Sequence, residues 1–289
     1  MSRAANCVRR EIPSQLAASD LQIAYSYQGS AGVQRQVGAT SSVEADYVTT
    51  RARAELFQRS NINLTYNEAT GANYPFTDIS RRPYPDFGLV NQFRSDGWSN
   101  YHALQTAFTR RMSNNWQASA TYLLAMLKDA QSSPAPFTVA PDLGGEYSLA
   151  ASDQRHRMVF NGIWQLPYAM QLSGLYFYGS GERFSTSYGG DLRATGATGG
   201  RLRPDGTIVP RNSLVGNPIH RVDVRILRRF PLATHARVDG ILEVFNLFNH
   251  ANYGSYITAE SNTRYATPTS NTNVAYQPRM LQLGFRATF

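Results

Sequence analysis

The sequence is poor in cysteine, in charge and in long apolar runs, and each shortage excludes a class of protein. Cys7 is the single cysteine among 289 residues, which excludes a disulfide scaffold and a cysteine-based zinc site. A helix that spans a membrane needs roughly 20 apolar residues in succession. The longest unbroken apolar run that we find is 122–127, so helical membrane spans are excluded. The first twenty residues also contain no stretch that resembles a signal-peptide core.

Motifs of common enzyme and cofactor sites are missing as well. The sequence contains no HExxH pair, no GxSxG and no phosphate-binding glycine framework. Gly179-Ser180-Gly181 is interpreted as a turn at a strand end, and 189–200 as a flexible outer loop. We therefore expect no catalytic residue, no metal and no cofactor. Each histidine is expected to be isolated on a different element: His102, His156, His220, His235 and His250.

The charged residues make up 17% of the chain and the hydrophobic ones 42%, a balance that argues against intrinsic disorder. Basic residues outnumber acidic ones by 28 to 20, for a net charge of +8. These basic residues are spread along the chain without an aromatic-basic recognition motif, so no nucleic-acid partner is expected. We expect Arg201, Arg203 and Arg211 to meet lipopolysaccharide or an acidic substrate instead.

What the sequence does contain is alternation of apolar and polar residues. The last strand shows it best, and its apolar positions predict the terminal strand that barrel-assembly machinery would recognise. These positions are Leu281, Leu283, Phe285, Ala287 and Phe289. Similar alternation predicts further strands at 20–28, 98–111, 116–128, 154–167, 170–182, 219–231 and 235–248, besides 277–289.

The connections alternate between two lengths. Short turns at 113–115, 167–169 and 231–234 lie between long polar stretches at about 131–153, 183–218 and 249–276. Transmembrane β-barrels have short periplasmic turns and long outer loops. We therefore predict an all-β, antiparallel transmembrane barrel segment of about eight to ten long strands. On this topology 20–28 runs up and 98–111 runs down, while 29–87 holds one more hairpin or an outer loop.

Charged residues on the predicted strands alternate with the apolar ones, and such charges suit a water-filled lumen better than a dry core. We expect the pair Asp223/Arg225, and Asp239 and Glu243 with Arg237, to form lumen networks. The candidate lumen charges are Arg221, Asp223, Arg225, Arg237, Asp239 and Glu243.

Aromatic residues near the strand ends suit either interfacial girdles or core packing. They are Trp98, Tyr101, Trp116, Trp164, Tyr168, Tyr176 and Tyr178. Loop tyrosines are candidates for substrate contact: Tyr188, Tyr253, Tyr256 and Tyr265.

Several motifs together carry a family resemblance. They are VRREIP (8–13), YSYQGSAG (25–32), RRPYPDFG (81–88), DGWSNYHALQTAFTRRM (96–112), RHRMVFNGIWQLP (155–167), RVDVRILRRFPL (221–232), EVFNLFNHANYG (243–254) and the terminal PRMLQLGFRATF. In this order they resemble the C-terminal barrel of TonB-dependent outer-membrane receptors of the large Oar-like type, which carries a carboxypeptidase regulatory domain. The resemblance implies a plugged barrel of about 22 strands and energy-coupled uptake of a large or scarce substrate.

The chain departs from that family in what it lacks. An export signal, the regulatory domain, the plug and the box that engages TonB are not found. We therefore expect 1–289 to be the C-terminal part of one outer-membrane barrel domain, with open sheet edges near 20–28 and 277–289. The implied partners are outer-membrane lipid and lipopolysaccharide, barrel-assembly machinery and the missing plug-bearing half, with TonB only through that half.

Two other interpretations stay open. One is a small self-contained outer-membrane barrel that acts as a pore or adhesin. The other is a soluble, secreted β-sandwich that binds carbohydrate. The side chains of Val224, Trp164, Leu283 and Phe285 distinguish the sandwich from both barrels, because a sandwich would seal them beneath a second layer.

Overall fold

A computed structural model describes residues 14–59, 62–63, 74, 77–130, 146–190, 200–201, 203–205, 207–233, 236–270 and 277–289. The VRREIP motif, His235 and parts of the three predicted long loops lie outside these residues. Among the described residues, no helix is long and apolar enough to cross a membrane.

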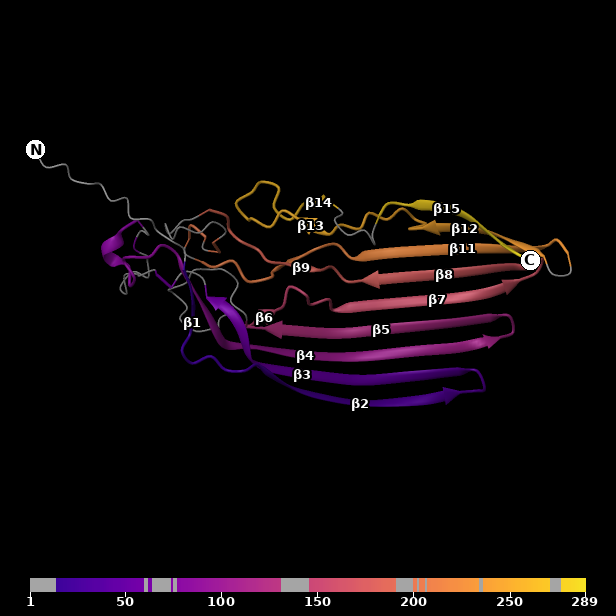
Figure 1. Cartoon of the computed structure of the whole chain (residues 1–289), viewed down its shortest axis with the longest axis horizontal. Helices are drawn as coiled ribbons and strands as arrows, with labels where there is room; N and C mark the ends of the chain where they lie inside the picture. Colours follow the sequence, from indigo (N-terminus) through magenta and orange to yellow (C-terminus); the bar gives the residue numbers. More distant parts are fainter. Residues whose placement is uncertain are drawn as a thin grey trace, which may run out of the picture.

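One antiparallel sheet of long strands dominates the structure (Figure 1). Its order is β15-β12-β11-β8-β7-β5-β4-β3-β2, so each strand lies beside its neighbours along the chain. The long strands are β2 (Tyr25–Val37), β3 (Ser41–Arg59), β4 (Val90–Ser113), β5 (Trp116–Asp129), β7 (His156–Leu166), β8 (Met170–Gly179), β11 (Ile219–Pro231), β12 (Arg237–Phe245) and β15 (Met280–Thr288). The predicted fold class and strand number are confirmed in the described part of the chain.

Several short elements lie at the end of this sheet opposite the short turns. β1 (Ser14–Ala17) runs parallel to the start of β4, and β6 (Ser148–Leu149) pairs with the end of β5. Two small hairpins stand apart from the main sheet, β9 (Arg183–Phe184) with β10 (Leu214–Val215), and β13 (Ser255–Tyr256) with β14 (Pro268–Ser270). The 3-10 turn η1 (Ile79–Arg81) precedes β4.

Residues 25–59 form a hairpin that the sequence defined poorly. β2 begins later than the predicted 20–28 and continues to Val37, where Gly38 adopts a φ of 65° and closes a short turn into β3. Because β2 pairs antiparallel with β3, and β3 antiparallel with β4, β2 runs toward the short turns. The predicted upward direction of this strand was therefore wrong. The prediction ended the strand at residue 28, whereas the strand continues to Val37 and reaches a short turn there.

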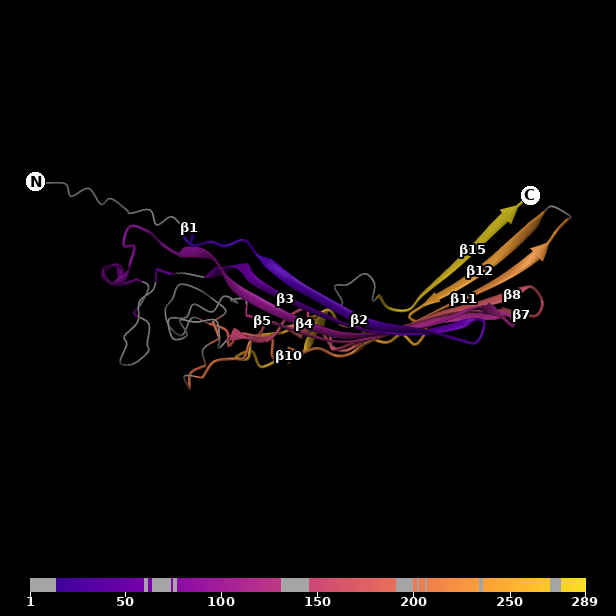
Figure 2. The same cartoon turned by 90° about the horizontal axis from the view of Figure 1, so that it is seen from below.

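The sheet is a single curved layer (Figure 2). Cross-strand register places the apolar positions of neighbouring strands directly opposite one another on one face, which we call the apolar face. One such row is Leu283, Leu242, Ile226, Leu172, Trp164 and Trp116. Leu283 is 75% exposed and Phe285 is 83% exposed. In the described part of the chain no second layer covers this face, as a β-sandwich would require.

The opposite face, which we call the polar face, carries ion-paired residues of the same strands, such as Arg225 and Glu243. The sheet ends at β2 on one side and at β15 on the other, and no described strand pairs with either outer edge. The edge at β15 lies within the predicted 277–289, and the edge at β2 overlaps the predicted 20–28 at 25–28. Because both edges are open, the described sheet is not a closed barrel.

The pairing of β3 with the longest strand, β4, shifts register at a β-bulge between Arg53 and Phe57. The backbones approach so closely there that a Cβ at Gly97 would lie 2.8 Å from the Glu55 carbonyl oxygen. Ala54, inside the bulge, has a φ of 56°. The bulge separates the regular pairing of 41–53 with 98–110 from the pairing of 57–59 with 92–94.

Gly97→Ala is expected to lower the free energy of unfolding by about 1–3 kcal/mol, because the new methyl group overpacks this contact. Gly284→Ala on β15 is the control, since its Cβ would meet the Ile241 Cβ at an ordinary 3.7 Å. Urea unfolding in detergent, followed by tryptophan fluorescence, measures both variants. Equal stability of the two would contradict the close approach.

Candidate functional site

Three long connections lie at one end of the sheet, opposite the short turns (Figure 1). They join β5 to β7, β8 to β11 and β12 to β15. We call their described residues the loop platform; these are 146–155, 180–190, 200–201, 203–205, 207–218 and 246–270, with 277–279.

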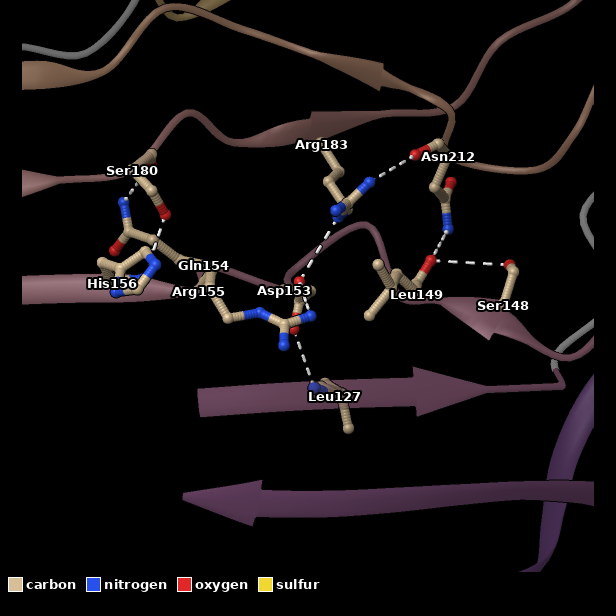
Figure 3. Close-up of polar contacts among 10 residues, drawn as sticks. All are labelled: Leu127, Ser148, Leu149, Asp153, Gln154, Arg155, His156, Ser180, Arg183 and Asn212. Carbon is tan, nitrogen blue, oxygen red and sulfur yellow. Dashed lines mark hydrogen bonds and ion pairs between the residues drawn. The ribbon is translucent and has the colours of Figure 1, made fainter. Parts of the chain in front are cut away.

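Asp153 is the centre of the first two connections (Figure 3). Its side chain is buried, with the residue 3% exposed. One carboxylate oxygen accepts a hydrogen bond from the Leu127 amide at 2.8 Å. The other oxygen accepts from Arg183 Nε at 3.3 Å and lies 3.8 Å from Arg155 Nη2. One carboxylate thus ties the end of β5 to the connection that follows β8.

Asn212, shown in Figure 3, and its neighbour Arg211 continue this contact. Asn212 Nδ2 donates to the Leu149 carbonyl at 2.9 Å, and the backbone carbonyl of Asn212 accepts from Arg183 Nη1 at 3.4 Å. Asn212 has a φ of 52°, a conformation that asparagine adopts more readily than most residues. Arg211 forms an ion pair with Asp129 and donates to Ser148 Oγ at 3.2 Å. Burial lowers the pKa of the Arg211 guanidinium.

Ser180 joins the same two connections directly above the sheet. Its carbonyl accepts a hydrogen bond from Gln154 Nε2 at 3.0 Å, and its hydroxyl accepts from the His156 amide at 3.1 Å (Figure 3). β8 ends at Gly179, so the interpretation of 179–181 as a strand-end turn is confirmed. Gly181 allows a further close approach, because a Cβ there would collide with the Gly216 carbonyl oxygen.

The connection from β12 to β15 binds to the one from β8 to β11. Arg203 donates two hydrogen bonds to Glu260, at 2.6 and 2.8 Å, and these hold the pKa of the Glu260 carboxyl below its usual value. The Glu260 amide donates to the Ser187 carbonyl at 2.9 Å. Phe184 and Tyr256 rings lie 4.9 Å apart. All three long connections are therefore linked into one structure.

The predicted role of the loop arginines was wrong. Arg201 is 4% exposed and paired with Glu146, while Arg211 is 8% exposed. Arg203 is committed to Glu260. These side chains hold the platform together rather than present free positive charge, because carboxylates distant in sequence fold against them. Of the loop tyrosines, Tyr256 is also structural, since its hydroxyl accepts from the Asn217 amide at 2.7 Å.

The six candidate lumen charges all lie on the polar face. Arg225 pairs with Glu243 directly opposite, at 3.7 Å, so the predicted pairing of Asp223 with Arg225 was wrong. Asp223 instead pairs with Arg221 at 2.7 Å. The register of β11 on β12 decides this choice, since it places Glu243 directly opposite Arg225.

Asp239 is the most buried of these charges. Arg237 lies 3.9 Å away, as predicted, and Arg286 of the terminal strand donates to the carboxylate at 2.8 Å. Sequence reasoning missed Arg286, although it stands directly opposite Asp239 in the register of β12 and β15. The apolar positions 281, 283, 285 and 287 lie on the other face of β15, and Phe289 follows the strand, fully exposed.

The four histidines that the structure describes are not isolated, contrary to the prediction. Three of them accept or donate a hydrogen bond, through Nδ1, with a stacked tyrosine on a neighbouring strand. We call these the Tyr–His pairs: Tyr47–His102 at 2.7 Å, Tyr122–His156 at 2.8 Å and Tyr176–His220 at 3.0 Å. His220 also meets His250, with ring centroids 5.1 Å apart. Pairing between strands far apart in the sequence creates these contacts, so no local sequence motif could predict them.

The aromatic positions divide between the two faces. The register places Trp98, Trp116, Trp164, Tyr176 and Tyr178 on the apolar face, as girdle residues require. Tyr168 lies in a short turn and is exposed. Tyr101 stands opposite Thr50 and Leu127 on the polar face, so of the two interpretations the girdle does not apply to it.

Among the residues that the structure describes, no group of three or more histidine, cysteine, aspartate or glutamate side chains is arranged to hold a metal ion.

A family profile described as "Outer membrane beta barrel domain" matches residues 11–208 and 203–282. No curated protein matches the chain. Solved structures do: the outer membrane transporter YddB from Escherichia coli has a TM-score of 0.54 at 12% identity, over 96% of this chain and 34% of that one. The FrpB iron transporter from Neisseria meningitidis gives 0.51 at 12% identity, over 96% and 33%. The ferric-catecholate import receptor Fiu from E. coli K12 gives 0.50 at 14% identity, over 94% and 28%.

The chain thus spans about a third of the length of these transporters. At such low identity the likeness concerns the fold. At the level of the fold, the resemblance to the barrel of TonB-dependent outer-membrane receptors is confirmed.

Asp153→Ala is expected to loosen the loop platform, because it leaves the Leu127 amide and Arg183 without their buried acceptor. Breaking a buried ion pair by removing one partner costs about 3–5 kcal/mol, enough for well over a tenfold rise in cleavage rate. Limited proteolysis of the full chain measures this rate. Asp205→Ala is the matched control, since exposed Asp205 accepts only local hydrogen bonds from Thr207. Cleavage of both variants at the wild-type rate would refute the role of Asp153.

The Arg203–Glu260 contact is expected to weaken in acid. A carboxyl whose pKa is depressed in the folded state contributes stability above its unfolded pKa, near 4.3, and loses it as the pH falls through the folded value. The protection of the Glu260 and Ser261 amides from hydrogen exchange, measured against an unstructured peptide at the same pH, should therefore fall below about pH 4. Glu260→Gln should show fast exchange already at neutral pH, and protection of these amides in that variant would count against the contact.

Proposed function

The chain belongs to the outer membrane beta barrel domain family, and from this we propose that it is the C-terminal sector of a plugged, TonB-dependent outer-membrane transporter. It is an outer-membrane β-barrel protein related in fold to transporters. In the complete barrel, energy supplied through TonB would drive uptake of a large or scarce substrate. The observation that carries the proposal is an open sheet that matches 96% of its own length to 34% of a transporter.

The open edges support a larger barrel. In lipid every backbone N–H and C=O must find a partner, since each unsatisfied group costs several kcal/mol. The outer edges of β2 and β15 have no partner among the described strands. Further strands that pair with both edges would remove this cost.

Strand direction argues against direct closure of the described sheet on itself. β2 and β15 both run toward the short-turn end, so pairing them would create a parallel seam. All other neighbouring long strands in this sheet are antiparallel, and bacterial single-chain barrels contain an even number of strands. An additional set of strands, odd in number, restores both conditions. The proposal therefore ranks above a small self-contained pore or adhesin.

The two faces support the same architecture. The apolar face would contact lipid, while the ion pairs of the polar face would line the lumen and meet the plug. Arg221–Asp223 and Arg225–Glu243 are suited to that place because they are only partly buried and water would solvate them. The platform would form part of the outer surface where substrate arrives, and β15 would be the strand that barrel-assembly machinery engages.

Heat-modifiable migration on a denaturing gel tests the proposal. A closed barrel in detergent migrates faster before heating than after, so the 289-residue chain alone is expected to migrate identically in both samples. A complete outer-membrane barrel in the same detergent is the positive control. A protease-resistant, heat-modifiable form of the chain alone would establish a self-contained barrel and overturn the proposal.

The DNA upstream of Met1 provides an independent readout. The proposal expects coding sequence for a plug, whether in the same frame or as an adjacent split gene. Its absence, together with a closed barrel on the gel, would favour the pore or adhesin.

A further inference from the structure

The Tyr–His pairs lie at equivalent places on three different hairpins. Each histidine precedes the short-turn end of its strand by ten or eleven residues: His102 to Ser113 on β4, His156 to Leu166 on β7, and His220 to Pro231 on β11. All three pairs are on the apolar face. The pairs therefore form a row across the sheet at nearly constant height above the short turns.

That height matches the thickness of a membrane. Strands rise about 3.3 Å per residue and tilt by about 40° in barrels, so eleven residues span about 28 Å along the membrane normal. The apolar band of an outer-membrane barrel is about 25 Å tall. Trp116 and Trp164 lie near the lower boundary, so the Tyr–His pairs lie at the upper one, where amphipathic rings are favoured.

A basic row lies one step beyond this boundary. Tyr27, Arg51, Asn100 and Lys128 stand directly opposite one another on β2, β3, β4 and β5. Each is two residues further toward the long loops than the row that holds His102. Arg51 is exposed, and Lys128 is half-buried, with its ammonium 5.6 Å from the centre of the Tyr147 ring. Two cations thus project from the apolar face at the level of lipid headgroups.

Neighbouring groups favour an anion at this place. Arg53 lies in the next row and donates to Asn100 Oδ1 at 3.2 Å, and Asn100 Nδ2 donates to the Tyr147 hydroxyl at 2.7 Å. On β2 to β5 the described apolar face carries no carboxylate between the Tyr–His pairs and Trp98. Asp96, further along β4, is paired with Arg94 at 3.0 Å.

We propose that Arg51 and Lys128 bind the phosphate groups of lipid A, the membrane-embedded part of lipopolysaccharide, in the outer leaflet. The proposal rests on the proposed orientation, in which the long loops face outward. Guanidinium and ammonium groups at this height form charge-assisted hydrogen bonds to phosphate, while the acyl chains lie against the apolar face below. The buried loop arginines take no part.

Binding of purified lipid A to the full chain in detergent micelles tests this site. The double variant Arg51→Gln/Lys128→Gln is expected to bind bis-phosphorylated lipid A about tenfold or more weakly, since each basic side chain contributes to binding at an anionic surface. The matched control is Arg35→Gln/Arg228→Gln, which removes two exposed cations from the apolar face close to the short turns. Its affinity is expected to equal that of the wild type.

Three further arms decide between sources of the signal. Lipid A stripped of its phosphates should bind the wild type as weakly as the intact lipid binds the double variant, and excess inorganic phosphate should not displace the lipid. The charge-preserving exchange Arg51→Lys/Lys128→Arg should retain the affinity, which separates lost charge from lost folding. Equal weakening of the control, or undiminished binding of phosphate-free lipid A, would overturn the proposal. These outcomes do not depend on whether the chain closes by itself on a gel.

Discussion

Backbone hydrogen bonding is the constraint on which the structure depends. From β3 to β12 every long strand has a neighbour on both sides, and only β2 and β15 keep an open edge within the described chain. A single layer in lipid has no second sheet and no water to satisfy those edges. The proposal of further strands rests on this constraint, and so does the difference between this sheet and a soluble sandwich.

The period of two residues then distributes side chains between two environments. Apolar residues fill the central rows of one face, with cations such as Arg51 and Arg228 nearer its ends, while ion pairs such as Arg225–Glu243 lie on the other face. Stability of such a sheet does not come from a sealed core. It comes from the backbone ladder, from cross-strand neighbours of about 0.2–1 kcal/mol each, and from contact of the apolar face with hydrocarbon.

The loop platform is stabilised by different means. Buried or half-buried charges connect segments far apart in sequence: Asp153 binds Arg183, and Glu260 binds Arg203. Such pairs contribute specificity of arrangement more than net stability, because burial of each charge costs desolvation energy. A platform that is fixed in this way holds its described residues in one defined arrangement.

The sequence by itself determined the strands, because alternation is a local property: the predicted 116–128 and 219–231 match β5 and β11 closely. It also determined the face of the terminal-strand residues, as the exposed positions of Leu283 and Phe285 on the apolar face show. Only the tertiary structure decided the partners. Register between strands joins His102 to Tyr47 and Arg286 to Asp239. No spacing along the chain encodes these contacts, because a long connection separates the two strands of each pair.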